Sequence, residues 1–249
     1  MAYSYLRLIG SASTFGYPKL FSFIDQTPVL PVTSGLSGLY FLRDSPDLLK
    51  NYANTSLPLI KVGSPSLGVN YSFVNKGIYY DTSIIPASNW SAIIITDVHA
   101  GGARLDLSNY GDDSAGDSFG SSSSGSSPYT IYASATPTLK SANTAVSSYA
   151  GFQIMGGVFG AAPALKRIDP TTGAVQTVAV NMTGATRTTP PSRTLRIGSH
   201  YLTSGGFAGN GKISLVAIYN NKLLTDAEFV SNGAYLINTW CPSMNLVLS

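Results

Sequence analysis

The sequence has few of the residues on which several common functions depend. Its one cysteine, Cys241, excludes a disulfide within the chain. Charged residues make up 11% of the chain, against a usual share of about 25%. Histidine occurs twice, and glutamate occurs once, at Glu228. These shortages argue against disulfide scaffolds, zinc sites built from cysteine and histidine, and enzymes that need paired glutamates.

Long apolar runs and dense positive charge are missing too. No stretch of about 18 apolar residues occurs, so no membrane insertion is expected. No charged segment followed by an apolar one opens the chain, so no secretory signal is expected. The net charge is +3, and the three arginines between residues 187 and 196 are spread among threonines and prolines. The sequence therefore predicts no nucleic-acid binding.

Short strand-like runs, separated by glycine, proline and asparagine, fill most of the chain. This pattern predicts an all-β fold of two packed sheets. A short helix is expected at 45–53, with Ser45 as its N-cap. The predicted strands lie at 38–43, 58–62, 69–74, 77–80, 90–97, 103–109, 128–134, 151–156, 175–180 and 194–199.

The segment from Ser204 to Cys241 is the most informative part of the sequence. Residues 212–219 alternate with period 2, which predicts a strand covered on both faces. Its alternation places Ile213, Leu215, Ala217 and Tyr219 on one face and Ser214, Val216 and Ile218 on the other. A capped helix is expected next, with Thr225 as N-cap, Glu228 completing a capping box and Leu224 packing on Phe229. Its apolar stripe is Phe229, Leu236 and Trp240.

This segment resembles the end of concanavalin A-like (laminin G-like) jelly-roll domains. In that family a glycine-rich turn leads into a strand and then into a short closing helix. The residues that carry the resemblance are Phe207, Gly209, Gly211, Ile213, Ile218, Tyr219, Leu224, Thr225, Asp226, Ala227 and Glu228. The resemblance implies a two-sheet jelly-roll sandwich over residues 36–249, with a short C-terminal helix.

Residues 1–35 form a different kind of segment. Proline cannot donate a hydrogen bond within a sheet, so Pro18, Pro28 and Pro31 predict an extended arm rather than a central strand. Its apolar residues are too many for a free tail, so the arm is expected to dock on a partner or on its own domain. The opening residues 1–20, together with the low charge, resemble virion proteins of tailed bacteriophages.

A low-complexity loop is predicted at Tyr110–Pro128. Structureless stretches of this length are uncommon in compact domains and are often functional. Aromatic rings beside carboxylates suit sugar binding, so the candidate ligand-binding residues are Tyr110, Asp112, Asp113, Asp117 and Phe119. The alternative is ordinary packing of tyrosines in a sandwich. Jelly-roll lectins often bind calcium, but these aspartates lack the spacing of a calcium loop, so no cofactor or metal is predicted.

Two enzyme signatures were weighed and set aside. The jelly-roll glucanases need two carboxylates on one strand, and the single glutamate, Glu228, is already used as a helix cap. Residues 116–120 match the nucleophile elbow around Ser118, with Asp169 and His200 following in order. An elbow needs a helix after the serine, whereas serines and another strand follow here. The sequence therefore predicts no enzyme.

The leading hypothesis is a non-enzymatic structural protein of a tailed-phage virion, in the tail tip, a fibre or a head decoration. It implies a virion location, other virion proteins as partners and a homo-oligomer. The alternative is a module that binds a host-surface glycan or receptor through residues 110–128. Fold alone does not choose between the two hypotheses.

Overall fold

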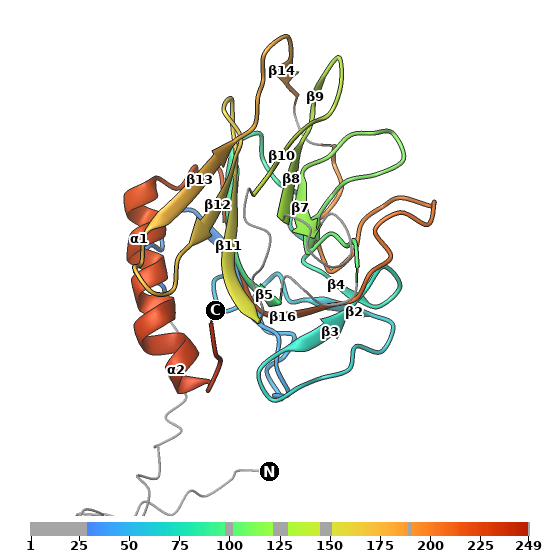
Figure 1. Cartoon of the computed structure of the whole chain (residues 1–249). Coiled ribbons are helices and arrows are strands. Elements are labelled where there is room, and N and C mark those ends of the chain that lie inside the picture. The colour runs from blue at the N-terminus through green and yellow to red at the C-terminus, as the bar shows by residue number, and fades with distance from the viewer. Residues whose placement is uncertain (1–28, 98–101, 122–128, 145–150, 189–190, 249) are drawn as a thin grey trace, which may run out of the picture.

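The structure is a computed structural model, and it describes residues 29–97, 102–121, 129–144, 151–188 and 191–248. Within these ranges two antiparallel sheets pack face to face, as the sequence predicts (Figure 1). A C-terminal helix covers the outer face of one sheet (Figure 1). No helix in these ranges is long and apolar enough to span a membrane.

The first sheet, here called the helix-side sheet, has seven strands. Its strands, in spatial order, are β1 (Leu36–Phe41), β16 (Gly211–Asn220), β5 (Trp90–Asp97), β11 (Phe152–Phe159), β12 (Ala164–Ile168) and β13 (Val175–Ala179), and β3 (Ser72–Val74) pairs with β16. All eight residues of β5 are buried. A strand covered on both faces can be apolar throughout, which explains the run of isoleucines in β5.

The second sheet, here called the loop-side sheet, also has seven strands. Its strands, in spatial order, are β10 (Lys140–Asn143), β8 (Tyr129–Ala133), β7 (Ser118–Ser121), β6 (Leu107–Ser108), β15 (Arg196–Ile197), β4 (Tyr79–Asp81) and β2 (Ile60–Val62). A separate two-stranded pair joins β9 (Ala135–Thr136) to β14 (Thr186–Arg187), seen at the top of Figure 1. The strands β7, β10 and β12 are absent from the sequence-based prediction.

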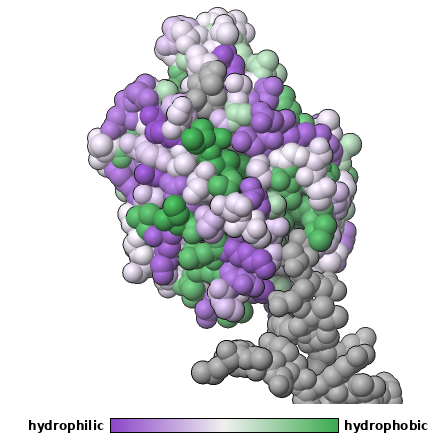
Figure 2. Space-filling model, turned by 180° about the vertical axis from the view of Figure 1, so that it is seen from behind, coloured by the Kyte–Doolittle hydropathy of each residue, from purple (hydrophilic) through white to green (hydrophobic). Residues whose placement is uncertain are grey.

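Two apolar layers hold the molecule together. The layer between the sheets contains Trp90 stacked on Phe159, with ring centroids 4.2 Å apart, together with Phe119 and Ile131. The layer between the helix-side sheet and the helix contains the predicted stripe of Phe229, Leu236 and Trp240. Outside these layers the surface is mixed, and Figure 2 shows apolar patches interspersed with hydrophilic residues.

The strand predicted at 212–219 is confirmed as β16, but its predicted faces are partly wrong. The pairing of β16 with β5 slips between Ile213 and Leu215. Such a bulge inserts one residue and reverses the side-chain alternation beyond it. Ile213 therefore joins Val216 and Ile218 between the sheets, while Leu215 faces the helix.

The predicted helix cap is confirmed. Helix α1 (Asp226–Tyr235) starts after Thr225, whose hydroxyl accepts a hydrogen bond from the Glu228 amide at 3.3 Å. The Glu228 carboxylate accepts one from the Thr225 amide at 2.8 Å. The helix continues as a π-helical turn, η2 (Leu236–Trp240), and ends in α2 (Cys241–Ser243).

The helix predicted at 45–53 is wrong, because residues 46–49 form a turn. The Ser45 hydroxyl accepts a hydrogen bond from the Asp47 amide at 3.2 Å, two residues on, which closes a local turn instead of capping a helix. The Asn51 side chain also binds the amides of Ala53 and Asn54, which fixes the chain in a non-helical path.

The end of the predicted arm packs on its own domain. Leu30 is buried in the layer beneath the helix. The Val32 amide donates to the Asn232 side chain at 3.1 Å, and the Val32 carbonyl accepts from the Tyr219 hydroxyl at 3.0 Å. The sandwich begins with β1 at residue 36, and residues 1–28 of the predicted arm lie outside the described residues.

We predict that Glu228→Ala lowers the free energy of unfolding by about 0.5–2 kcal/mol, the usual cost of losing a helix cap. Lys222 and the Thr225 amide lower the pKa of Glu228, so its contribution is present at neutral pH and is lost as pH falls through that lowered pKa. Chemical denaturation at pH 7 measures the effect. Glu228→Gln, which can still accept the Thr225 N–H, should recover most of the loss, and an Ala variant as stable as the wild type would contradict the prediction.

Candidate functional site

Only part of the predicted 110–128 loop is a loop. Residues 109–117 connect β6 to β7, and Ser118–Ser121 form the buried strand β7. The prediction of one structureless stretch is therefore wrong for residues 118–121, and residues 122–128 lie outside the described residues. The Phe119 side chain alternates inward into the core and so fixes β7 in the sheet. We call residues 109–117 the hairpin loop.

Arg193 holds the hairpin loop in shape from a distant part of the sequence. Its two terminal nitrogens donate to the two carboxylate oxygens of Asp113, each at 2.9 Å. The same guanidinium donates to the carbonyl of Ala115 at 2.7 Å and to that of Asn109 at 2.9 Å. A planar guanidinium matches this fork of acceptors, which a lysine cannot do.

Asp112 anchors the tip of the hairpin loop to residues 201–203. Both of its carboxylate oxygens lie 3.0 Å from the Thr203 amide. Hydrogen bonds from Thr203 lower the pKa of Asp112, and hydrogen bonds from Arg193 lower that of Asp113. Both side chains are therefore ionised at neutral pH, and each is directed to a protein donor.

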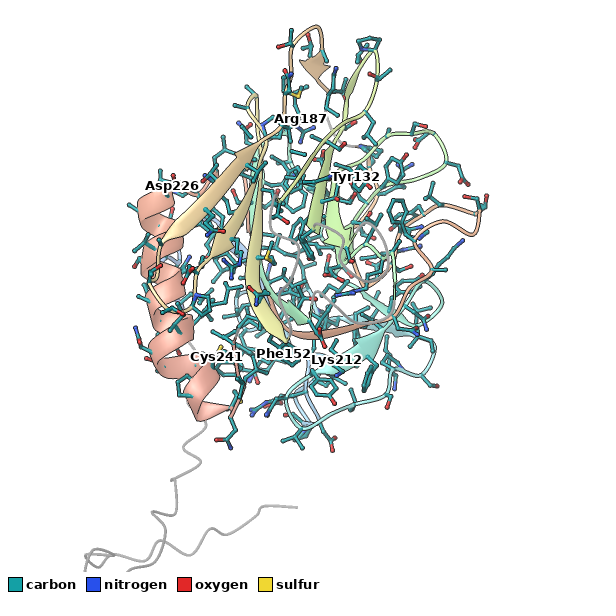
Figure 3. All side chains as sticks on the ribbon, viewed as in Figure 1. Tyr132, Phe152, Arg187, Lys212, Asp226 and Cys241 are labelled. Atoms are coloured by element: carbon teal, nitrogen blue, oxygen red, sulfur yellow. The ribbon has the colours of Figure 1, made fainter. Side chains whose placement is uncertain are left out.

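Tyr110 stands on a small aromatic cluster outside the core. Its ring lies 6.4 Å from that of Tyr132, at an interplanar angle of 19°. Tyr132 in turn meets Phe207 edge-on at 5.7 Å. Tyr132 lies on the face of β8 opposite the buried Ile131, and Figure 3 labels it on the side of β8 away from the helix. Tyr110 stays half-buried, so part of its ring is available to a ligand.

An open groove of about 750 Å³ runs beside Tyr110. One wall is the hairpin loop, through Tyr110, Asp113, Ser114 and Ala115. The opposite wall consists of residues 134–139 with Thr188, and Pro191 also lines the groove. Its lining combines hydroxyl groups and one half-exposed aromatic ring with apolar side chains such as those of Pro137 and Leu139, which suits a polar ligand with an apolar face.

The structure brings together two of the five predicted site residues and separates the others. Tyr110 and Asp113 line the groove. Asp112 lies in the same loop but binds Thr203. Asp117 and Phe119 were predicted as ligand residues on an exposed loop, but both are fully buried, so neither presents a surface to a ligand. The Asp117 carboxylate faces inward because it accepts hydrogen bonds from Trp90, Ser134 and Arg187. Phe119 faces inward because its ring packs in the core between the sheets.

Asp117 forms a buried ion pair. Its carboxylate accepts hydrogen bonds from the Trp90 indole at 2.9 Å, the Ser134 amide at 2.9 Å and the Arg187 guanidinium at 2.5 Å. Burial raises the pKa of Asp117, while Arg187 and the other donors favour its charged form. Sequence reasoning missed both Arg187 and Arg193, because it treated the arginines at 187–196 only as a weak basic stretch.

The nucleophile elbow is not formed around Ser118. Ser118 lies inside β7, and its buried hydroxyl has no hydrogen-bond partner among the described residues. His200 is buried as well, and its Nδ1 accepts a hydrogen bond from the Leu202 amide at 3.1 Å. A strand in place of the strained turn leaves the serine without the exposure that a nucleophile needs.

The loop aspartates bind protein groups rather than facing one another. Across the described ranges, no three histidine, cysteine, aspartate or glutamate residues cluster in a way that could hold a metal ion. The three loop aspartates diverge, since Asp112, Asp113 and Asp117 bind Thr203, Arg193 and Arg187, respectively. These three side chains therefore do not converge as the ligands of a calcium ion would.

Comparison with known proteins identifies the fold. The sequence matches no protein-family model, and a search of the curated proteins finds no match. A mutant sialidase of Trypanosoma rangeli with trans-sialidase activity is similar in structure, with TM-score 0.59 and 12% identity over 87% of this chain and 34% of that one. This chain thus spans about a third of the sialidase's length.

Two further structures are similar to this chain with somewhat lower TM-scores. A botulinum neurotoxin type C structure gives TM-score 0.55 and 11% identity, over 79% of this chain and 50% of that one. Domain 4 of AbnA, an arabinanase from Geobacillus stearothermophilus, gives TM-score 0.52 and 11% identity, over 80% of this chain and 98% of that one. At these identities the similarity establishes a two-sheet β-sandwich fold and nothing finer.

We predict that Arg193→Lys loosens the hairpin loop without unfolding the domain. Lysine cannot reproduce the bonds to Asp113, Ala115 and Asn109 at once. Amide hydrogen exchange should therefore speed up at Gly111 and Ser114, whose N–H groups bond within the loop. Arg167→Lys is the matched control, because Arg167, on β12 of the helix-side sheet, binds Gln153 and pairs with Asp169. Equal amide exchange rates at Gly111 and Ser114 in the two variants would contradict the role of Arg193 in holding the hairpin loop.

Proposed function

We propose that this domain binds carbohydrate in the groove beside Tyr110. The observation that carries the proposal is the half-buried Tyr110 ring, held at a fixed angle by Tyr132 and set beside a groove lined with hydroxyl groups. A sugar ring presents an apolar face to such a ring and hydroxyls to the walls. The tyrosine supplies contact area with few rotatable bonds, so little entropy is lost on binding.

The walls supply the hydrogen bonds that a sugar needs. Each serine or threonine hydroxyl is both donor and acceptor, so it can match a sugar hydroxyl in either sense. The exposed hydroxyl-bearing residues that line the groove are Ser114, Thr136 and Thr138, whereas the hydroxyls of Ser134 and Thr188 bond each other. The volume of about 750 Å³ is within the usual range for small-molecule sites, roughly 300–1,000 Å³.

The structural neighbours support a role in sugar binding. The neurotoxin structure is described as depending on interaction with two ganglioside molecules for cell entry. The AbnA domain is described in complex with arabinotriose. Because fold alone does not determine function, the argument for this chain rests on its own groove, and the neighbours add only that sandwiches of this shape serve such roles.

We infer binding rather than hydrolysis. Glycoside hydrolysis requires a carboxylic acid with a raised pKa at the bond that breaks. The groove's own carboxylate, Asp113, has its pKa lowered by Arg193, so it is a poor proton donor. Asp117 has a raised pKa, but it is fully buried and binds three protein donors. This argument supports the prediction that the protein is not an enzyme.

We also infer that the ligand is a neutral sugar. Recognition of a sugar carboxylate calls for a guanidinium or ammonium group that is free to bind it. The two arginines near the groove are engaged by the protein: Arg193 binds Asp113, and Arg187 binds Asp117. The site therefore has no net positive charge to offer a sialic or uronic acid.

The virion hypothesis stays a prediction. No neighbour is a phage protein among those compared above, and no contact in the described structure bears on virion partners, on a homo-oligomer or on a virion location. Glycan binding and a place in a virion are compatible, since a receptor-binding part of a phage would do both. Carbohydrate binding is the part that the groove supports.

We predict that Tyr110→Ala weakens oligosaccharide binding by about tenfold or more, because the stacking surface is lost. Tyr79→Ala is the matched control: Tyr79 is also half-buried and lies on β4, where it packs on Arg196 outside the groove. A glycan array first identifies an oligosaccharide that binds the wild-type protein. Isothermal titration with that oligosaccharide then gives the affinity of each variant. An equal loss in the two variants, or no loss at Tyr110, would contradict the proposed site.

We predict that neutral oligosaccharides bind more tightly than sialylated ones. A panel containing arabinotriose and other neutral trisaccharides is compared with sialyllactose at low and high salt. Binding of the neutral ligand should change little with ionic strength, because no ion pair with the ligand forms. Tighter binding of sialyllactose that weakens with salt would show that a cation in the site is free after all.

A further inference from the structure

We propose that Asp117 and Arg187 are positioning residues that fix the spacing between the two walls of the groove. Asp117 was a candidate ligand residue from the sequence, but its fully buried side chain cannot reach a ligand. Its contacts instead connect the two walls. The inference deepens the proposed function, since it concerns the same groove.

Asp117 is the last residue of the first wall. Its amide donates to the Asn109 side chain at 2.8 Å, and its carbonyl accepts from the Asn109 amide at 3.1 Å, so the two ends of the hairpin loop are joined. Gly116 has φ of +117°, and a Cβ there would lie 2.5 Å from the Asn109 carbonyl oxygen. A glycine is thus required for the chain to turn this tightly into Asp117.

The Asp117 carboxylate also accepts hydrogen bonds from the opposite wall. Its Oδ1 accepts the Ser134 amide, and its Oδ2 accepts Arg187. Arg187 then donates to the carbonyl of Thr188 at 2.6 Å and to that of Ser134 at 3.3 Å. The hydroxyls of Ser134 and Thr188 lie 2.8 Å apart. Both chain segments of the second wall are therefore tied to one carboxylate of the first.

The arrangement of strands explains why a separate tie is needed. The second wall is held by a short pair, in which Ala135 faces Arg187 and Thr136 faces Thr186. Figure 3 labels Arg187 at the lower end of this pair, above β7 and β8. So short a pair is weak on its own. A buried ion pair is weak evidence for added stability, whereas the bonds of this guanidinium join separate chain segments in a way that an ammonium cannot reproduce.

The test measures the spacing between the walls directly. Spin labels are placed at Ser114→Cys and Thr138→Cys, two exposed positions on opposite walls, and the distance distribution is recorded by double electron–electron resonance. The native Cys241 is buried and should stay unlabelled. The key variant is Arg187→Lys, which keeps the charge on Asp117's partner but loses the fork. Asp117→Asn, which leaves a buried guanidinium unpaired, is the more severe second variant.

Arg104→Lys is the matched control. Arg104 is buried and pairs with the buried Asp106 at 2.7 Å, at the other end of the β6–β7 hairpin. We expect Arg187→Lys to shift or broaden the distance between the walls and to weaken oligosaccharide binding by about tenfold, because the second wall must then be ordered on binding. Arg104→Lys should lower thermal stability without changing the distance or the affinity.

The positioning role of Asp117 and Arg187 and the proposed sugar binding can fail independently. A wild-type distance distribution in both Arg187→Lys and Asp117→Asn, whatever their stability, would overturn the positioning role. A shifted distance in a protein that binds no oligosaccharide would support the positioning role and contradict the proposed function. A shifted distance with unchanged affinity would overturn the inference that wall spacing controls binding.

Discussion

Burial of the helix-side sheet on both faces is the constraint on which the rest of the structure depends. Its central strands, β5 and β16, face the second sheet on one side and the C-terminal helix on the other. Strands enclosed in this way have no face left for a ligand. The outer face of the loop-side sheet, with half-exposed Tyr79 and Tyr132, and the ends of the sandwich are where recognition can occur. The groove lies at such an end.

Two buried aspartates connect the sheets at the two ends of β5. Asp117 accepts the indole N–H of Trp90, the first residue of β5, and Asp106 accepts the hydroxyl of Thr96 near its last. Asp106 also accepts the Tyr129 hydroxyl at 2.6 Å from the loop-side sheet. Each aspartate is paired with an arginine, which satisfies its charge in the interior. Directed bonds of this kind fix how the two sheets align, whereas apolar packing alone would tolerate small slips.

The sequence was sufficient to predict the elements whose signals are local. The strand at 212–219, the cap at Thr225 and Glu228, and the apolar stripe of the helix follow from period and spacing, and the structure confirms them. The bulge near Ser214 could not be predicted, because it depends on the partner strand. The strand β12 was missed because its Lys166 and Arg167 look exposed in sequence. In the structure Lys166 reaches Asp226 at 2.5 Å, so the strand is buried despite its charges.

In the candidate site, too, only the features with a local sequence signal could be predicted. Tyr110 and Asp113 could be chosen from composition, because aromatic rings beside carboxylates in a loop are a local signal. The second wall and both arginines that order the groove come from segments about 20 to 80 residues further along, and no spacing in the sequence links them to the loop. Glycine-rich, serine-rich composition also disguised β7, whose Gly120 lies where no side chain fits. A Cβ on Gly120 would stand 2.2 Å from the Arg104 carbonyl oxygen.

The charged side chains nearest the groove are paired within the protein. Three arginines that looked like a diluted basic stretch each pair with an aspartate: Arg187 with Asp117, Arg193 with Asp113 and Arg196 with Asp81. Their charges are therefore used to order the groove and the sheet beside it rather than to attract an anionic partner. The groove itself is lined by hydroxyl groups, one half-exposed ring and several apolar side chains, together with the paired Asp113. Such a lining is compatible with the neutral sugar proposed above, which would bind through shape complementarity and several directed hydrogen bonds.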